Sequence, residues 1–267
     1  MGIWDYSDQV LDKGLVTKGL KLKTCPFCRT KLQTITKFSD GPTHNTETED
    51  LLSSLIINVC LVCGWWGTAS YMLGKFQNNN GDEVRYAQFG ALATLRNLNL
   101  SDLSTPIDEV RQFLIAKYDS RHSIHPRLFE ETVASVFKGL GYKVKVTAYS
   151  GDGGIDVVLE EETNREVGVQ VKRYKGTIQV EQIRAFAGAL LLGGYTKGVY
   201  VTTSRFASGA SKTATAAALR GIEIELVDAD SFYAALEISQ MQGPSVIDQV
   251  VSGVRQQRLM LLEKKVY

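Results

Sequence analysis

Four cysteines are the feature that most constrains how this 267-residue chain can fold. They form two Cys-x-x-Cys pairs, Cys25 with Cys28 and Cys60 with Cys63, and no cysteine follows. Two intervening residues let both thiolates of a pair face one ion, and two such pairs complete the tetrahedral shell that zinc prefers. Because all four ligands are thiolates, the predicted zinc is structural. Disulfides are disfavoured in a reducing cytosol, a redox pair would not need its twin, and iron–sulfur clusters usually have other spacings.

The segment between the two pairs indicates a hairpin. Thr34–Lys37 and Leu55–Val59 are the expected strands, and the polar stretch Ser39–Asp50 lies between them. Together with the cysteines this resembles a zinc ribbon. Trp65 and Trp66, beside the second pair, could stack on nucleic-acid bases. The favoured interpretation is that they form the core of a domain too small to fold without metal.

The bulk composition is that of a soluble globular protein, with 44% hydrophobic and 22% charged residues. The longest apolar candidate, Ala185–Tyr195, is shorter than the ~18 residues of a membrane span, and the N-terminus lacks the pattern of a secretory signal. We therefore expect a cytoplasmic protein without a membrane partner. The net charge of +1 supplies no overall field, so any phosphate-binding face must arise from local clustering.

The confinement of the cysteines to the first part of the chain predicts two domains. We expect a zinc-binding N-terminal domain over residues 1–105 and a helical linker over 106–124. A second domain should occupy 125–240, followed by a C-terminal helix over 241–267. Within the first domain, Glu83–Leu100 has a weakly helical pattern.

The second domain has a regular alternation of elements. A helix should begin at Pro126 and end at Gly141. The expected later elements are strands around Val144 and Val146, at Ile155–Leu159 and Glu166–Arg173, a helix at Val180–Leu191, a strand at Gly198–Thr202, a helix at Ser208–Leu219 and a strand at Ile222–Val227. The order α-β-β-β-α-β-α-β predicts an α/β sandwich with a mixed central sheet.

Three polar residues on two of these strands suggest chemistry. Asp156 lies among apolar neighbours, where a carboxylate is costly unless something binds it. Gln170 and Lys172 share a face of the next strand, and a hairpin over residues 160–166 would bring them to Asp156. The oxygens could then hold a hard divalent cation, leaving Lys172 for a water nucleophile or a phosphate. The ordinary alternative is a salt bridge between Asp156 and Lys172.

Two glutamates on the preceding helix compete as a further ligand. At ~100° per residue, Glu130 lies about 70° from the centre of the apolar face, whereas Glu131 lies about 170° away. Glu130 is therefore the candidate. The apolar face consists of Phe129, Val133, Val136, Phe137 and Leu140. Asp152 lies in a glycine-rich turn, which explains it without a metal, so it ranks below Asp156.

Residues 126–236 resemble the Mrr-type catalytic domain of restriction endonucleases, in the PD-(D/E)xK nuclease superfamily. The matching motifs are Phe129-Glu130, Gly141-Tyr142, the run from Gly151 to Asp156, Gln170-Val171-Lys172, and the run from Val201 to Ser204. The resemblance implies that Asp156, Glu130 and the Val171 carbonyl or Gln170 side chain hold Mg²⁺ or Mn²⁺, with Lys172 at the nucleophile. Gln170 stands where the general pattern has an acidic residue, a substitution typical of the Mrr-like branch, and it leaves the metal one charge fewer.

The implied activity is a Mg²⁺-dependent endodeoxyribonuclease in restriction or anti-phage defence, acting on foreign or modified DNA. Arg173, Thr203 and Ser204 are the expected substrate contacts, and a homodimer or a defence-system partner protein is compatible with this role. Two alternatives stay open: a non-catalytic nucleic-acid-binding effector module, and the same chemistry on RNA or branched DNA, because such a metal site reads only the phosphodiester.

Overall fold

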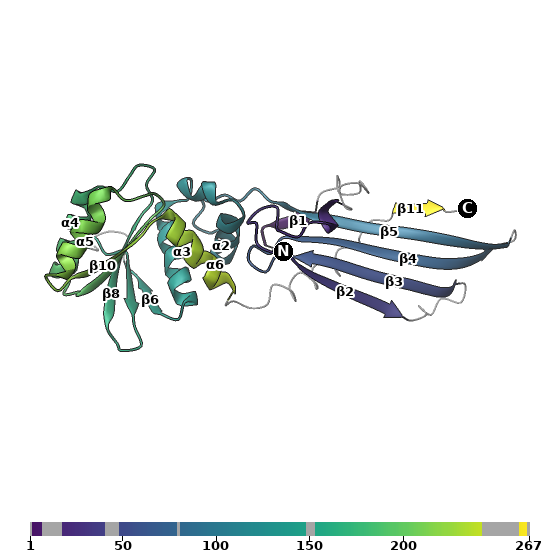
Figure 1. Cartoon of the computed structure of the whole chain (residues 1–267), viewed down its shortest axis with the longest axis horizontal. Coiled ribbons are helices and arrows are strands. Elements are labelled where there is room, and N and C mark those ends of the chain that lie inside the picture. Colours follow the sequence, from purple (N-terminus) through teal and green to yellow (C-terminus); the bar gives the residue numbers. More distant parts are fainter. Residues whose placement is uncertain are drawn as a thin grey trace. The chain divides into compact units, whose positions relative to one another are not determined.

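The computed structural model describes residues 2–6, 18–40, 48–78, 81–147, 153–241 and 262–265. The chain divides into two compact units (Figure 1). Unit 1 comprises Met1–Asn97 with Pro244–Tyr267, and unit 2 comprises Leu98–Gly243. The linker expected over 106–124 therefore lies inside unit 2. Among the described helices, none is long and apolar enough to cross a membrane.

Unit 1 is built on an antiparallel sheet of strand order β1-β5-β4-β3-β2, with β11 also paired to β5. Its strands are β1 (Trp4–Tyr6), β2 (Gln33–Asp40), β3 (Thr48–Val59), β4 (Trp66–Asn78), β5 (Gly81–Leu95) and β11 (Leu262–Lys265). The hairpin between the cysteine pairs is confirmed, because β2 pairs with β3 and sets Lys37 opposite Leu55. Both strands extend well beyond the predicted ends, into the stretch expected to be a polar loop.

Two predictions for unit 1 were wrong. The weakly helical stretch at 83–100 is mostly the strand β5, because pairing with β4 on one side and β1 on the other outweighs a weak local preference. The C-terminal helix expected over 241–267 is not continuous, since Leu262–Lys265 forms β11. That strand pairs with β5 at Arg85–Gln88, where it satisfies backbone groups that β1 does not reach. Residues 242–261 lie outside the described part of the chain.

Unit 2 has a mixed five-stranded sheet of order β10-β9-β8-β7-β6, which confirms the α/β fold class. Neighbours among β6, β7 and β8 are antiparallel, and β8, β9 and β10 are parallel. The strands are β6 (Lys143–Val146), β7 (Val157–Glu160), β8 (Glu166–Lys172), β9 (Lys197–Thr202) and β10 (Glu223–Val227). The helices are α2 (Ile107–Ala116), the 3-10 helix η2 (Tyr118–His122), α3 (Pro126–Gly139), α4 (Val180–Leu192), α5 (Ser208–Ala218) and α6 (Ala229–Met241).

Local sequence explains where α3 begins and ends. Pro126 takes the first helical position, which needs no N–H, and the His125 side chain caps the helix by accepting a hydrogen bond from the Arg127 N–H at 3.2 Å. Just beyond the helix, Gly141 has a φ of +100°, a backbone conformation that residues other than glycine rarely adopt. The predicted limits of this helix are thereby confirmed.

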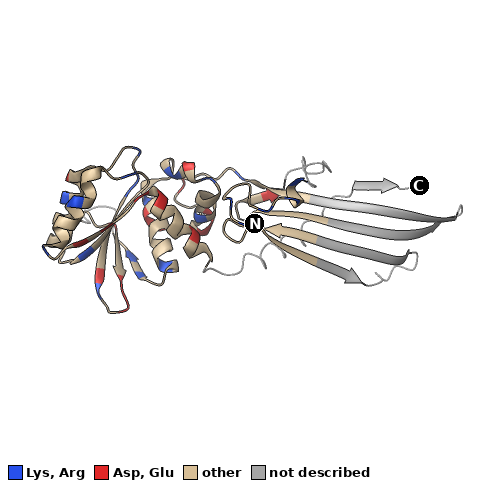
Figure 2. Cartoon of the chain, viewed as in Figure 1, with Lys and Arg blue, Asp and Glu red and all other residues tan. Residues whose placement is uncertain are grey.

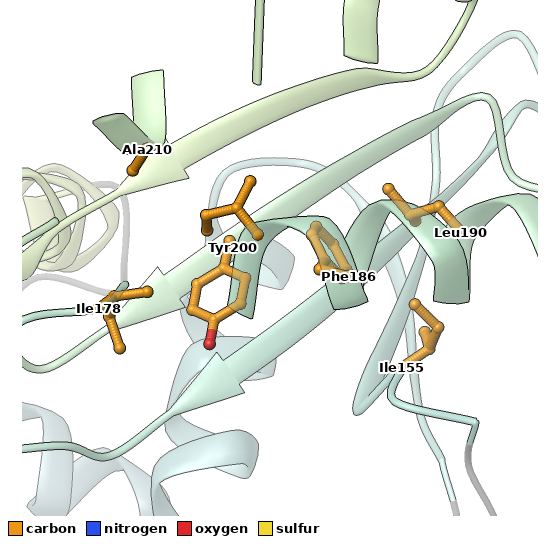
Figure 3. Packing of buried hydrophobic residues seen from close by; sticks show 7 residues of the cluster. Ile155, Ile178, Phe186, Leu190, Tyr200 and Ala210 are labelled. Carbon is orange, nitrogen blue, oxygen red and sulfur yellow. The ribbon is translucent and has the colours of Figure 1, made fainter. Parts of the chain in front are cut away.

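The helices α4 and α5 pack on one face of the sheet around a buried cluster (Figure 3). Gly198 lets α4 approach closely, because a Cβ atom there would lie 2.5 Å from the Leu190 Cδ1 atom. On the other face, α3 contacts β6, β7 and β8 and packs against α6 (Figure 1). The rings of Phe129 in α3 and Phe232 in α6 meet edge to face. The cluster consists of Ile155, Ile178, Ile183, Phe186, Leu190, Tyr200 and Ala210.

Candidate metal-binding and catalytic sites

The four cysteine sulfurs of unit 1 come together in one cluster, all within 4.8 Å of one another. The Sγ–Sγ distances are 3.5 Å for Cys25 and Cys63, 3.4 Å for Cys28 and Cys60, and 3.6 Å for Cys28 and Cys63. A tetrahedral zinc ion with Zn–S bonds of ~2.3 Å separates its sulfurs by about 3.8 Å. The cluster therefore fits zinc in size and donor chemistry.

The two cysteine pairs are built in the same way. In each, the N–H four residues after the first cysteine donates to its carbonyl: Arg29 to Cys25 and Gly64 to Cys60, both at 3.0 Å. Arg29 and Gly64 have φ values of 64° and 76°, in the left-handed region. Glycine adopts this conformation at little cost, whereas arginine does not. The second pair therefore carries the stronger local signal for the turn.

The crowding of the four thiols makes their proton affinities unequal. The pKa of Cys63 is raised, first by its hydrogen bond with Cys25, then by those with the other two thiols and by burial. The hydrogen bond with Cys25 is also the leading cause that lowers the pKa of Cys28. A divalent cation would allow all four sulfurs to be thiolates at once.

The two tryptophans beside the cluster belong to its core. Trp65 and Trp66 are 2% and 6% exposed, and the Trp65 indole donates to the Ala93 carbonyl at 3.0 Å. Trp4 donates to the Cys63 carbonyl at 2.6 Å. These rings are not available to stack on bases, so the core interpretation is confirmed.

In unit 2, Asp156 lies just before β7 and is fixed against β8. Its N–H donates to the Val169 carbonyl at 2.8 Å, and its Oδ2 atom accepts a hydrogen bond from the Val171 N–H at 2.6 Å. Val157 pairs with Val169, so the same register sets Asp156 opposite Gln170. The predicted hairpin is confirmed, and it brings the carboxylate to the backbone between Gln170 and Lys172. Gly151 and Asp152 lie outside the described residues.

Gln170 lies in a row of polar groups that the sequence indicated only in part. Gln170 pairs with Tyr200 of β9, so both side chains lie on the sheet face that α4 and α5 cover. A Cβ atom placed on Gly154 would lie 3.7 Å from the Gln170 Nε2 atom. Burial and, second, the charge of Asp156 raise the pKa of Tyr200 to about 12. Tyr200 was missed because Val199-Tyr200-Val201 reads as core; only the register with Gln170 identifies it. Lys172, two residues on, is exposed.

Glu130 is paired with an arginine that the sequence did not single out. Arg127 donates from its Nη1 atom to the Glu130 Oε2 atom at 3.1 Å, and its Nε atom lies 3.3 Å from the Glu131 Oε1 atom. The Glu130 side chain is 14% exposed and that of Glu131 is 36% exposed. The order of burial agrees with the helical phase, while metal binding by Glu130 stays a prediction.

Thr203 and Ser204, the expected substrate contacts after β9, form hydrogen bonds within unit 2. The buried hydroxyl of Thr203 accepts a hydrogen bond from the Tyr174 N–H and donates to the Tyr174 carbonyl, both at 2.9 Å. The Ser204 hydroxyl donates to the Gly176 carbonyl. Both side chains therefore secure the loop that follows β8, whereas Arg173 in that loop is exposed.

Several cations lie beside this loop, and we call Arg121, Lys172, Arg173 and Lys175 the basic edge. Arg173 donates to the His122 carbonyl at 2.9 Å, and Arg121 donates to the Thr203 carbonyl at 3.1 Å. Burial first, and then Arg121, Lys175 and Arg173, lower the pKa of His122. Over unit 2 as a whole, positive and negative segments are interspersed (Figure 2). The basic edge is a local cluster of the kind that a phosphate-binding face would require here, although Asp119 lies 3.1 Å from Arg121.

Comparison with known proteins finds a family match within unit 2. Residues 121–236 match the family model described as a restriction endonuclease, Mrr_cat. The type IV methyl-directed restriction enzyme EcoKMrr of Escherichia coli strain K12 is 37% identical over 94 residues, which span 33% of this chain and 31% of that protein. The solved structure of a DNA-bound ATP-dependent Type ISP restriction-modification enzyme, LlaBIII, is 19% identical to this chain. The match has a TM-score of 0.30 and covers 47% of this chain and 8% of that one. Residues 121–236 thus form a restriction endonuclease domain of the Mrr_cat type.

Proposed function

We propose that this protein is a divalent-metal-dependent endonuclease that hydrolyses DNA phosphodiester bonds in restriction or anti-phage defence. The observation that carries the proposal is the Asp156 carboxylate, held by the Val171 N–H at 2.6 Å beside Gln170 and Lys172. A strand end that presents an acid, an amide and an exposed lysine to one place suits phosphodiester hydrolysis better than structural support.

The donor set fits a hard divalent cation. Asp156, Glu130 and the Val171 carbonyl or Gln170 side chain would hold Mg²⁺ or Mn²⁺, since all of them offer oxygen. When bound, such an ion stabilises charge on the phosphate and acidifies water. Because Gln170 is neutral, the two carboxylates carry the whole negative charge of the set.

Lys172 would act on the nucleophile. Its side chain is exposed at the end of β8, two residues beyond Gln170 on the same face. From this position its ammonium group can orient a water molecule against the phosphorus atom or contact a phosphate oxygen. The neutral, buried phenol of Tyr200 borders the same row and keeps its proton at neutral pH, because its pKa is about 12.

The basic edge would bind the DNA backbone. Arg173 and Lys175 are exposed on a loop that Thr203 and Ser204 anchor, while Arg121 is held by the Thr203 carbonyl and lies 4.5 Å from the Tyr118 ring centre. Phosphate contacts of this kind give affinity without reading sequence. Thr203 and Ser204 thus support the contact surface, and Arg173 makes the contact.

Salt dependence tests this surface. Replacing Arg173 or Lys175 with alanine should flatten the slope of log affinity against log salt by about 0.9 for each phosphate that the variant no longer neutralises. Binding is measured with Ca²⁺ in place of Mg²⁺ to prevent cutting. Lys138→Ala is the control, because Lys138 carries the same charge on the last turn of α3. Equal slopes for all three variants and the parent would contradict the assignment.

A plasmid assay tests the activity itself. The full chain with Mg²⁺ or Mn²⁺ should nick or cut DNA, and Asp156→Ala or Lys172→Ala should abolish this. Because the matched relative is methyl-directed by name, methylated duplexes come first, followed by unmethylated, single-stranded, branched and RNA substrates. Tight binding without cutting would instead support an effector module. Light scattering of the same preparation tests the expected homodimer.

A further inference from the structure

Arg127 joins three parts of unit 2 through one guanidinium group. It lies in the first turn of α3, where its Nη1 atom contacts the Glu130 Oε2 atom at 3.1 Å and its Nε atom lies 3.3 Å from the Glu131 Oε1 atom. The same Nη1 atom donates to the Thr147 carbonyl at 3.0 Å, just beyond β6. Its side chain is 21% exposed, so these contacts are partly shielded from water.

Thr147 carries the connection on to Asp156. Its N–H donates to the Asp156 carbonyl at 3.0 Å, and its hydroxyl lies 2.9 Å from the same oxygen and 2.8 Å from the Ile155 carbonyl. A single guanidinium and a single threonine therefore link the carboxylate of Glu130 to the backbone of Asp156. The two acids come from different parts of unit 2, α3 and the residue just before β7, and this link connects them.

Helix stabilisation does not account for the whole arrangement. Ion pairs three and four residues apart stabilise a helix by only ~0.2–0.5 kcal/mol each, and they need no partner outside it. The bond to the Thr147 carbonyl lies outside α3 and fixes the guanidinium in one plane. Only arginine offers several donors in such a rigid fork, so lysine could not make all three contacts.

We propose that Arg127 is a positioning residue that sets the Glu130 carboxylate against Asp156 so that both can bind one divalent cation. The inference rests on the proposed function. Arg127 does not touch the substrate or the cation; it acts by restricting the rotamers of Glu130 and by tying α3 to the strand that leads to Asp156. A pair of carboxylates held at a fixed separation binds a cation without the entropic cost of ordering them.

Metal affinity measured without catalysis tests the proposal. In a Lys172→Ala background, the full chain with bound DNA is titrated with Mn²⁺, and free Mn²⁺ is read from its electron paramagnetic resonance signal. Arg127→Met keeps the side-chain bulk and should raise the Kd for Mn²⁺ about tenfold. Arg127→Lys should fall between Arg127→Met and the parent. In the otherwise unaltered chain, Arg127→Met should need more Mn²⁺ for half-maximal kcat, with an unchanged KM for DNA.

Glu131→Gln is the matched control, because it weakens the other carboxylate contact of Arg127 and leaves Glu130 in place. It should keep the parent Kd for Mn²⁺. Thr147→Val, which retains the carbonyl, provides a second test if Arg127→Met does not fold; loss of the hydroxyl link should also weaken Mn²⁺ binding. A folded Arg127→Met variant with the parent affinity would overturn the inference. A parent that neither binds Mn²⁺ nor cuts DNA would overturn the proposed function instead.

Discussion

The two candidate metal sites of this chain are encoded in different ways. In unit 1, four ligands of one chemical type lie in two short pairs, and each pair forms its own turn. In unit 2, the candidate donors come from α3, from the residue before β7 and from β8, and hydrogen bonds through Arg127 and Thr147 connect them. In the first site, the spacing of the cysteines along the chain brings the ligands together. In the second, the donors come together only through the register of the sheet.

This difference teaches where each site is vulnerable. We expect the four clustered thiols to hold one cation, so the loss of that cation should also unfold unit 1. The donors of unit 2 lie around a sheet with its own buried core, so that unit should stay folded when single donors are replaced. Substitutions in unit 1 should therefore change stability, whereas those in the candidate catalytic site should change activity.

The largest expected effect is the loss of zinc from unit 1. Replacing Cys60 with serine should remove about one zinc ion per chain and unfold unit 1, because structural zinc binding contributes roughly 10 kcal/mol or more to such small domains. Metal analysis and circular dichroism measure both consequences. Thr30→Val is the control, since Thr30 lies 3.3 Å from the Cys28 sulfur but has no ligand role. A metal-free preparation with its β-sheet signal intact would refute the zinc assignment.

Lys172→Ala should show the opposite pattern. We expect kcat to fall by about 10²–10⁴-fold, as for other groups that move or orient a proton, while the thermal midpoint stays that of the parent. The midpoint should not move because Lys172 is exposed and its side chain supports no buried contact. Lys145→Ala, on the outer strand β6, is the control. If Lys172→Ala cuts DNA at the parent rate, Lys172 has no catalytic role.

Most of the fold of unit 2 could be predicted from the sequence, because the spacing of apolar residues within each helix and strand is a local signal. The pattern of Phe129, Val133, Val136 and Phe137 gave the helix, and Pro126 and Gly141 gave its limits. In unit 1 the helical pattern at 83–100 misled, because the pairing of β5 is a long-range property. No local signal near Glu83 indicates which strand lies beside it.

The candidate site shows the same limit at the level of side chains. Asp156, Gln170 and Lys172 could be found because one hairpin brings them together. Arg127 and Tyr200 could not be found, because spacing does not reveal the contact of Arg127 with Thr147 or the pairing of Tyr200 with Gln170. The hydroxyl of Thr203 holds a loop, which the sequence does not reveal, and its contact with substrate stays a prediction.

Thr203→Val tests the role of the Thr203 hydroxyl as a loop anchor. It removes the acceptor of the part-buried hydrogen bond from the Tyr174 N–H, which should cost about 0.5–1.5 kcal/mol of unfolding free energy in urea. DNA affinity should also fall, because the loop that carries Arg173 and Lys175 loses its anchor. Ser204→Ala is the comparison, and we expect a smaller loss because Ser204 is only half-buried. A variant with parent stability and weaker DNA binding would support a direct contact between Thr203 and the substrate.

The smallest expected effect concerns Tyr200. Its pKa rises from the ordinary value of about 10 to about 12, because burial and the charge of Asp156 disfavour the phenolate. A pKa that is raised on folding contributes stability below the unfolded pKa, and this contribution is lost as the pH rises from about 10 to about 12. Tyr200→Phe should therefore lessen the decline of the unfolding free energy across that range. Tyr195→Phe is the control, because the pKa of Tyr195 is also raised but its second cause is Glu166. An Asp156→Asn substitution is then added to each tyrosine variant. If it lessens the effect of Tyr200→Phe on this decline but not the effect of Tyr195→Phe, the charge of Asp156 contributes to the pKa of Tyr200. Equal responses of both tyrosines would show that burial alone sets the shift and that Tyr200 lies outside the electrostatics of the candidate site.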